Sequence, residues 1–232
     1  MFKKSSYFIE FRFQGYAKKY SKRVIWNVSK KFKVKGVTGK RVVPHISLYG
    51  PFTTTREKLM VSTFVDALSK YQLVPFRVKG FNYFNNTTNK VIYLDIEPSE
   101  RLVSLRRDLA KKLLRVTSTK STFDDKRTFY FHSTIAFKDI DRKFKQVWDY
   151  ISQQRPKQIN QHLLRVTIIK NGKILCEYDL MHGKLLNRRQ AKSRRIFQQT
   201  ISILKSKEIN FEEEFDPELS LWEKIKNFFD FN

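Results

Sequence analysis

The chain has 232 residues, which is enough for one large domain or two closely packed lobes with a sizeable core. A hydrophobic content of 41% and an aromatic content of 15% exclude an intrinsically disordered protein. The formal net charge of +25 sets up a strong positive field, so the partners that the composition favours are polyanions.

Apolar periodicity predicts alternating strands and helices along most of the chain. Alternation with period two indicates strands, and apolar positions three and four apart indicate helices. In chain order the predicted elements are a strand at 7–13, a helix at 16–35, a strand at 41–49, a helix at 54–71, strands at 74–84 and 91–96, a helix at 100–116, a strand at 128–137, a helix at 140–154, and strands at 162–170 and 173–180. Outside its apolar stripe, the helix at 16–35 is almost entirely lysine, arginine and serine, so we expect it to supply charge directed at phosphates.

Local signals predict where some of these elements begin and end. Thr54 is followed three residues later by Glu57, which is the pattern of a capping box at a helix start. Asn171 and Gly172 suit a type I′ turn, so the last two strands are predicted to form a hairpin. The segment 117–127 is expected to be a mobile surface loop.

The end of the chain differs from the rest in charge. Residues 208–232 contain eight acidic and two basic side chains. Helices are predicted within 187–207, with a basic face, and at 216–231. We therefore divide the chain into a domain at 1–187 and a helical extension at 188–232, basic and then acidic. The apolar stripes of the extension are expected to pack on the protein itself or to dock a partner; the alternative is that its acids compete with a polyanionic partner for the basic body.

Two of the four histidines share a local sequence. The segments HISL at 45–48 and HSTI at 132–135 each lie in a predicted strand, one in each half of the chain. Residues i and i+2 of a strand point to the same face, so His45 lies beside Ser47 and His132 beside Thr134. Two such strands brought together make a site of two imidazoles and two hydroxyls.

This set of groups suits the chemistry of a phosphodiester. One neutral imidazole accepts a proton from the attacking nucleophile while the other, protonated, donates to the leaving oxygen. The hydroxyls of Ser47 and Thr134 bind the non-bridging phosphate oxygens. This chemistry requires no metal and no cofactor, and none is predicted. Chance recurrence is the competing interpretation, and the placement in two equivalent strands of a strongly basic chain argues against it.

The remaining candidates are interpreted as structural. Tyr49 shares the predicted face of His45 and either stacks on a base at the rim of the cleft or belongs to the core; we favour the core. His162 and His182 have no partner at a metal-ligand spacing, so we do not interpret them as ligands. The pair Asp124–Asp125 is interpreted as a solvated turn.

The sequences PHISLYGPF and FHSTIAF resemble the paired histidine motifs of the 2H phosphoesterase superfamily, which includes 2′-5′ RNA ligase-like proteins and RNA 2′,3′-cyclic phosphodiesterases. The resemblance covers about residues 5–187. It implies an α+β fold, pseudo-symmetric and bilobal, with two antiparallel sheets flanked by helices and a central cleft. It also implies that His45 and His132 are catalytic and that Ser47 and Thr134 contact the phosphate.

The function expected from this resemblance is an RNA phosphodiesterase that hydrolyses a terminal 2′,3′-cyclic phosphate to a 2′-phosphate. Two alternatives stay open: cleavage or ligation of a 2′,5′ linkage in RNA, and RNA binding without catalysis. Single-stranded RNA or an RNA end is the expected partner. One cysteine, Cys176, allows no disulfide framework, and no apolar run is long enough to span a membrane, so a cytoplasmic location is expected.

Overall fold

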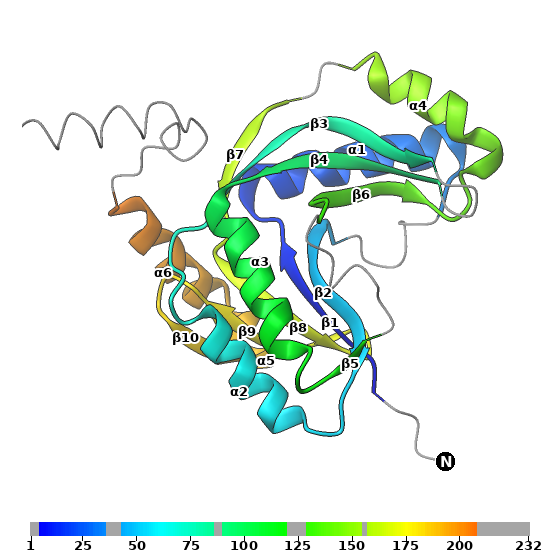
Figure 1. Ribbon diagram of the computed structural model, residues 1–232. Helices are drawn as coiled ribbons and strands as arrows, with labels where there is room; N and C mark the ends of the chain where they lie inside the picture. The colour runs from blue at the N-terminus through cyan, green and yellow to red at the C-terminus, as the bar shows by residue number, and fades with distance from the viewer. Residues whose placement is uncertain (1–4, 36–42, 86–89, 120–128, 155–156, 208–232) are drawn as a thin grey trace, which may run out of the picture.

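The fold consists of two antiparallel sheets, one of six strands and one of four (Figure 1). The computed structural model describes residues 5–35, 43–85, 90–119, 129–154 and 157–207. The six-stranded sheet has the order β10-β9-β8-β1-β2-β5 and the four-stranded sheet the order β6-β4-β3-β7. Both sheets mix sequence-distant strands, and both halves of the chain contribute to each of them.

The strands of the six-stranded sheet are β1 (Tyr7–Arg12), β2 (His45–Thr53), β5 (Ser118–Thr119), β8 (Arg165–Lys170), β9 (Lys173–Asp179) and β10 (Lys184–Asn187). Those of the four-stranded sheet are β3 (Pro75–Asn85), β4 (Lys90–Pro98), β6 (His132–Phe137) and β7 (Ile159–His162). The helices are α1 (Gly15–Phe32), α2 (Glu57–Leu68), α3 (Glu100–Leu113), the 3₁₀ turn η1 (Asp141–Lys143), α4 (Phe144–Ser152), α5 (Arg188–Ala191) and α6 (Arg194–Lys205).

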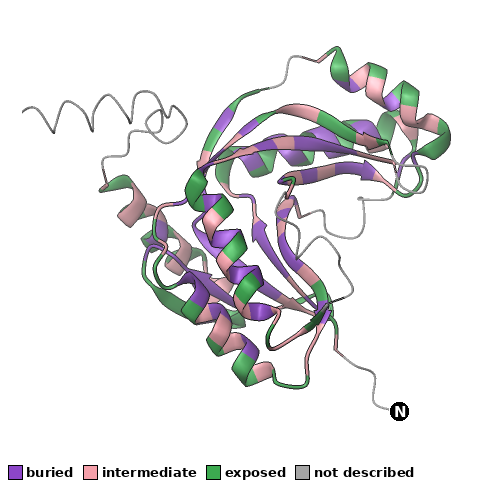
Figure 2. Ribbon diagram, in the orientation of Figure 1, coloured by how far each residue is buried: buried purple, intermediate pink, exposed green. Residues whose placement is uncertain are grey.

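Helices cover the sheets with the apolar stripes that the sequence predicts. α1 packs on β6, and its inward residues Tyr20, Val24 and Val28 are buried. α2 and α3 pack against each other, and α3 also contacts β2. Figure 2 shows the result, with buried residues concentrated in the strands and on the inner sides of the helices. Within the described residues, no helix is both long and apolar enough to cross a membrane.

The predicted hairpin is confirmed, and one predicted helix start is wrong. Asn171 and Gly172 have φ angles of 49° and 75°, as a type I′ turn requires, and join β8 to β9. Thr54 and Glu57 do not form a capping box, because α2 begins at Glu57 after Arg56, which makes no side-chain cap. The hydroxyl of Thr54 accepts instead from the amide of Arg56, at 3.0 Å, and donates to the carbonyl of Val116, at 2.9 Å.

Three short strands escape prediction from the sequence. β5 has two residues, and β7 and β10 have four each, which is too short for an alternating pattern to stand out. β5 falls at the start of the segment expected to be a mobile loop, and its residue Ser118 pairs with Thr53. The rest of that loop, 120–127, lies outside the described residues, as do the acidic segment 208–232 and its predicted helix.

α6 is joined to the six-stranded sheet through buried polar groups. Arg165 on β8 donates through Nε to Asp179 on β9, at 2.9 Å, and through a terminal nitrogen to the hydroxyl of Thr200 on α6, at 2.7 Å. Thr200 in turn donates to Asp179. All three residues are buried, and the apolar residues Phe197 and Ile201 of α6 pack on the core beside them. The described part of the extension therefore packs on the body of the protein; the boundary at 187 stays a prediction.

Candidate active site

The two histidines that were predicted to be catalytic lie on different sheets and begin their strands in the same way. His45 is the first residue of β2, and His132 is the first residue of β6. His45 Nδ1 lies 2.8 Å from the carbonyl oxygen of Val43, and His132 Nδ1 lies 2.9 Å from that of Tyr130. A carbonyl oxygen only accepts, so each Nδ1 carries its hydrogen and each Nε2 is the atom left to exchange a proton.

The strands carrying the histidines meet beside a cleft. β2 and β6 contact each other, although they belong to different sheets (Figure 1). The cleft has a volume of about 410 Å³. It is lined by Glu10, Arg12, Ile25, Val43, Pro44, His45, Ser133, Thr134, Phe137, Ile169 and Gly172. His45 and Thr134 thus face one space, whereas His132 is not part of its lining. The two imidazoles are nevertheless close enough for the charge of His45 to lower the pKa of His132.

The hydroxyls lie on the faces that the strand pattern predicts. Ser47 and Thr134 are partly exposed, as are His45 and His132, whereas the intervening residues of both strands are buried. Thr134 lines the cleft. Ser47 lies farther along β2, opposite Glu10 of β1 in the strand register. Their roles in binding phosphate stay predictions.

An ion pair beside His45 was not predicted from the sequence. Arg12 Nε lies 2.7 Å from Glu10 Oε1, and Glu10 Oε2 lies 3.8 Å from His45 Nε2. The register of β1 and β2 sets Arg12 opposite His45, which brings these groups together. The signal in the sequence was two charged residues on one face of the first predicted strand, in a segment that is otherwise apolar. Glu10 and Arg12 are therefore candidate residues of the active site, because they lie beside His45.

Aromatic rings surround His132. The ring centroids of Phe84 and Tyr93 lie 5.2 Å and 5.1 Å from that of the imidazole. Tyr130 lies 6.2 Å from Phe84 and is 66% exposed. Burial lowers the pKa of His132, the hydrogen bond to the carbonyl of Tyr130 partly opposes this, and the nearby charge of His45 lowers the pKa further. The imidazole of His132 is therefore more readily kept neutral than an ordinary histidine.

A comparison with protein families agrees with this arrangement. The family model described as the 2'-5' RNA ligase superfamily matches residues 24–173, which is more than half of the chain and includes both histidine motifs. The chain belongs to the 2'-5' RNA ligase superfamily. The resemblance inferred from the two motifs is thus confirmed. A sequence search of curated proteins finds no match.

Solved structures similar to this member of the superfamily include TT0787 of Thermus thermophilus, with 12% identity and a TM-score of 0.51, covering 76% of this chain and 98% of that one. Usb1 of Kluyveromyces marxianus is similar with 10% identity and a TM-score of 0.44, covering 79% of this chain and 97% of that one. Its structure with uridine monophosphate has 10% identity and a TM-score of 0.45, covering 79% and 98%. The likeness to TT0787 confirms the predicted α+β fold with two antiparallel sheets.

The residues that were interpreted as structural lie away from this site or in the core. Tyr49 is 1% exposed, and its hydroxyl shares a hydrogen bond with Thr117, so the core interpretation is confirmed. His162 is buried on β7, and His182 follows β9 beside Asp179. The pair at 124–125 lies outside the described residues. Within the described ranges, no group of three or more histidine, cysteine or acidic side chains is arranged to hold a metal ion.

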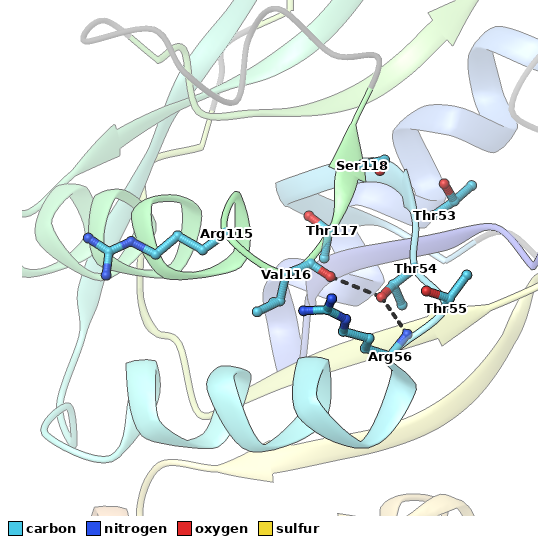
Figure 3. A pocket seen from close by; sticks show the side chains of 8 residues that line it. All are labelled: Thr53, Thr54, Thr55, Arg56, Arg115, Val116, Thr117 and Ser118. Atoms are coloured by element: carbon cyan, nitrogen blue, oxygen red, sulfur yellow. Dashed lines mark hydrogen bonds between the residues drawn. The ribbon is translucent and has the colours of Figure 1, made fainter.

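A second hollow, of about 290 Å³, lies at the far end of β2 (Figure 3). It is lined by Thr53, Thr54, Thr55, Arg56, Arg115, Val116, Thr117 and Ser118. Thr54 uses its hydroxyl within the protein, donating to the carbonyl of Val116 and accepting from the amide of Arg56. Figure 3 shows the side chain of Arg115 pointing away from the threonine side chains that line the hollow. With no histidine in its lining, this hollow is not the candidate site of the superfamily member.

Proposed function

We propose that this protein hydrolyses the 2′,3′-cyclic phosphate at an RNA end to a 2′-phosphomonoester by acid–base catalysis at His45 and His132. The observation that carries the proposal is the matched hydrogen bond of each Nδ1 to the carbonyl oxygen two residues earlier. This bond orients both rings and leaves one Nε2 from each sheet to transfer protons. Membership of the 2'-5' RNA ligase superfamily supports an RNA phosphoester as the substrate.

The surroundings of the two histidines favour different roles. Burial lowers the pKa of His132, so its imidazole is neutral at neutral pH and suited to accept a proton. His45 has the carboxylate of Glu10 3.8 Å from its Nε2, which is an ion-pair partner for a ring that carries the proton to be donated. We therefore assign His132 as the general base and His45 as the general acid.

In the proposed reaction a water molecule attacks phosphorus, and the bond from phosphorus to the 3′ oxygen breaks. His132 takes a proton from the water, and His45 gives a proton to the 3′ oxygen. The products are a 2′-phosphomonoester and a free 3′ hydroxyl. The hydroxyls of Ser47 and Thr134 hold the non-bridging oxygens as negative charge builds up on them. No metal ion or cofactor takes part in these steps.

The aromatic side chains beside His132 support a substrate with an unpaired base. Tyr130 is among the most exposed large aromatic residues of the described chain and stands next to Phe84, which packs on both Tyr93 and His132. An exposed ring backed by packed rings is a platform on which a base stacks without sequence preference. We propose that the terminal base of the RNA occupies this platform.

The proposal is tested with a short RNA ending in a 2′,3′-cyclic phosphate. His45→Ala and His132→Ala should each lower kcat/KM by at least about a hundredfold, because each imidazole moves a separate proton. His182→Ala is the matched control, since this histidine is exposed and far along the chain from both motifs, and its rate should equal that of the wild type. Wild-type rates in either cleft variant would refute the mechanism.

Parallel substrates separate the alternatives. Cleavage of a 2′,5′-linked dinucleotide, with the cyclic phosphate left intact, would leave His45 and His132 as the catalytic residues. The reaction would then be cleavage of a 2′,5′ linkage and not opening of the cyclic phosphate. RNA binding that His45→Ala and His132→Ala do not change, without turnover of either substrate by the wild type, would identify a non-catalytic RNA-binding protein.

A further inference from the structure

The outward side of α1 combines positive charge with an exposed tryptophan. Trp26 is 64% exposed, although its neighbours on the inward side, such as Val24, Ile25 and Val28, are buried in the core. Four basic residues share its side of the helix at helical spacing and are also exposed. We call the set of Lys19, Lys22, Arg23, Trp26 and Lys30 the outer face of α1.

The outer face of α1 is not an ordinary solvated helix surface. Surface helices commonly mix charges of both signs, which pair at i and i+4. α1 has no acidic residue. In the part of the chain that the structure describes, no ion pair involves a basic residue of the outer face.

The charges on this helix also repel one another. Lys19 and Arg23 lie at i and i+4, where like charges destabilise a helix. Partial burial is the main cause that lowers the pKa of Lys18, at the side of the face, and repulsion from Lys22 and Arg12 lowers it further. A bound anion would reduce this repulsion between the basic side chains and so stabilise α1. A large exposed ring at the centre of the charges adds a surface for stacking.

The outer face of α1 is connected to the cleft around the edge of one sheet. β6 is the edge strand of the four-stranded sheet, and α1 packs on it. Ile25, the neighbour of Trp26 in the chain, lines the cleft together with Ser133 and Thr134 of β6. An RNA strand that leaves the cleft past this edge therefore meets α1, which packs on β6 and lends Ile25 to the cleft.

We infer that the outer face of α1 is a second RNA-binding surface, which holds single-stranded RNA outside the cleft with its basic residues on phosphates and Trp26 stacked on an unpaired base. The inference rests on the proposed function only for the identity of the ligand as RNA. It adds that an RNA has to extend beyond the cleft to bind at full affinity, because the terminal nucleotide alone does not reach this surface.

An anionic membrane is the other polyanionic surface that basic helices bind. A helix that binds a membrane inserts a continuous apolar face. α1 has committed its apolar stripe to the core, from Ala17 to Val28, and leaves outward only Trp26 and, in the first turn, Tyr16. Isolated aromatic residues between cations fit successive bases and phosphates, and they lack the apolar area that insertion requires.

The test compares affinities for a labelled RNA with a free 3′ hydroxyl, which is not a substrate, so that binding is measured without turnover. The RNA has about 20 nucleotides, more than the roughly 4–16 that one single-strand site covers. Trp26→Ala should weaken binding about tenfold. The triple variant Lys19→Gln, Lys22→Gln, Lys30→Gln should lower the slope of log affinity against log salt by about 2, since each neutralised phosphate contributes roughly 0.7.

A control variant removes the same charge elsewhere. Lys58→Gln, Lys111→Gln, Lys205→Gln takes three exposed lysines from α2, α3 and α6 and should change the affinity and the salt slope less than the α1 triple. Turnover of a 2′,3′-cyclic mononucleotide should be the same in all variants. Failure of the wild type to turn it over would refute the proposed function and leave the binding comparison intact.

Three results would overturn the inference. The first is wild-type affinity for the long RNA in Trp26→Ala. The second is equal loss of affinity in the α1 triple and the control triple. The third is binding of wild-type protein to vesicles of anionic phospholipid that Trp26→Ala abolishes, with RNA binding unchanged, which would assign the face to a membrane.

Discussion

Thr200→Val tests whether α6 folds as one cooperative unit with the six-stranded sheet. The hydroxyl of Thr200 accepts from Arg165 at 2.7 Å and donates to Asp179 at 2.5 Å. Valine keeps the volume of the side chain and removes both of these hydrogen bonds, together with a longer one from the same hydroxyl to the carbonyl of Ile196, at 3.1 Å. Arg165 and Asp179 are 3% and 0% exposed, so water does not replace the lost partner.

The expected loss follows from what remains bonded. Asp179 keeps the Nε of Arg165 and the backbone amides of Met181 and His182. Arg165 loses its hydrogen bond to the hydroxyl on α6. Leaving a buried polar group unsatisfied costs about 1–3 kcal/mol, so we expect the free energy of unfolding to fall by about 2–3 kcal/mol.

The assay is urea unfolding followed by circular dichroism, with the free energy of unfolding obtained by linear extrapolation. Ser202→Ala is the control on the same helix, because Ser202 is exposed and its hydroxyl donates to a carbonyl of the same helix, that of Gln198. Its effect should stay within about 0.5 kcal/mol. A Thr200→Val protein as stable as this control would refute the conclusion that the polar network attaches α6 to the sheet.

Four further predictions concern pH, metal and substrate. Burial lowers the pKa of His162 from 6.5 to about 4, so between these pH values the unfolded state binds more protons than the folded state. The free energy of unfolding should therefore fall by roughly 2 kcal/mol from pH 7 to pH 5. His162→Gln should lose this pH dependence. Because the pKa of His132 is lowered, the acid limb of the kcat/KM profile should have its midpoint below 6.5, and a midpoint above it would contradict His132 as the base. Turnover should be unchanged in EDTA, and loss that a divalent ion restores would identify a metal-dependent reaction. Tyr130→Ala should raise KM for an RNA end about tenfold through lost stacking, and an unchanged KM would exclude the base platform.

The sequence predicts the parts of this fold that depend on local patterns. Long helices with a regular apolar stripe, such as α1 and α3, were found, and so was the turn at Asn171 and Gly172. The sidedness of His45 and Thr134 followed from strand alternation alone. The capping box at Thr54 failed because its hydroxyl accepts from the amide of Arg56, two residues later, and not from that of Glu57.

The rest depends on contacts between distant segments. Glu10 and Arg12 reach His45 only because β1 pairs with β2 in a register that no local pattern specifies. The burial of Arg165 and Asp179 cannot be predicted from the sequence, because charged side chains are rarely buried unless they have a partner. Their pairing appears only once β8 and β9 are aligned.

The most direct test of the proposed function is the identity of the product. A nucleoside 2′,3′-cyclic phosphate is incubated with the protein, and the phosphorus species are followed by ³¹P NMR. The account predicts conversion of the cyclic ester to the 2′-phosphomonoester by the wild type, and an unchanged cyclic ester with folded His45→Ala or His132→Ala. A cyclic ester that the folded wild-type protein leaves intact, or converts as fast without either histidine, would contradict it.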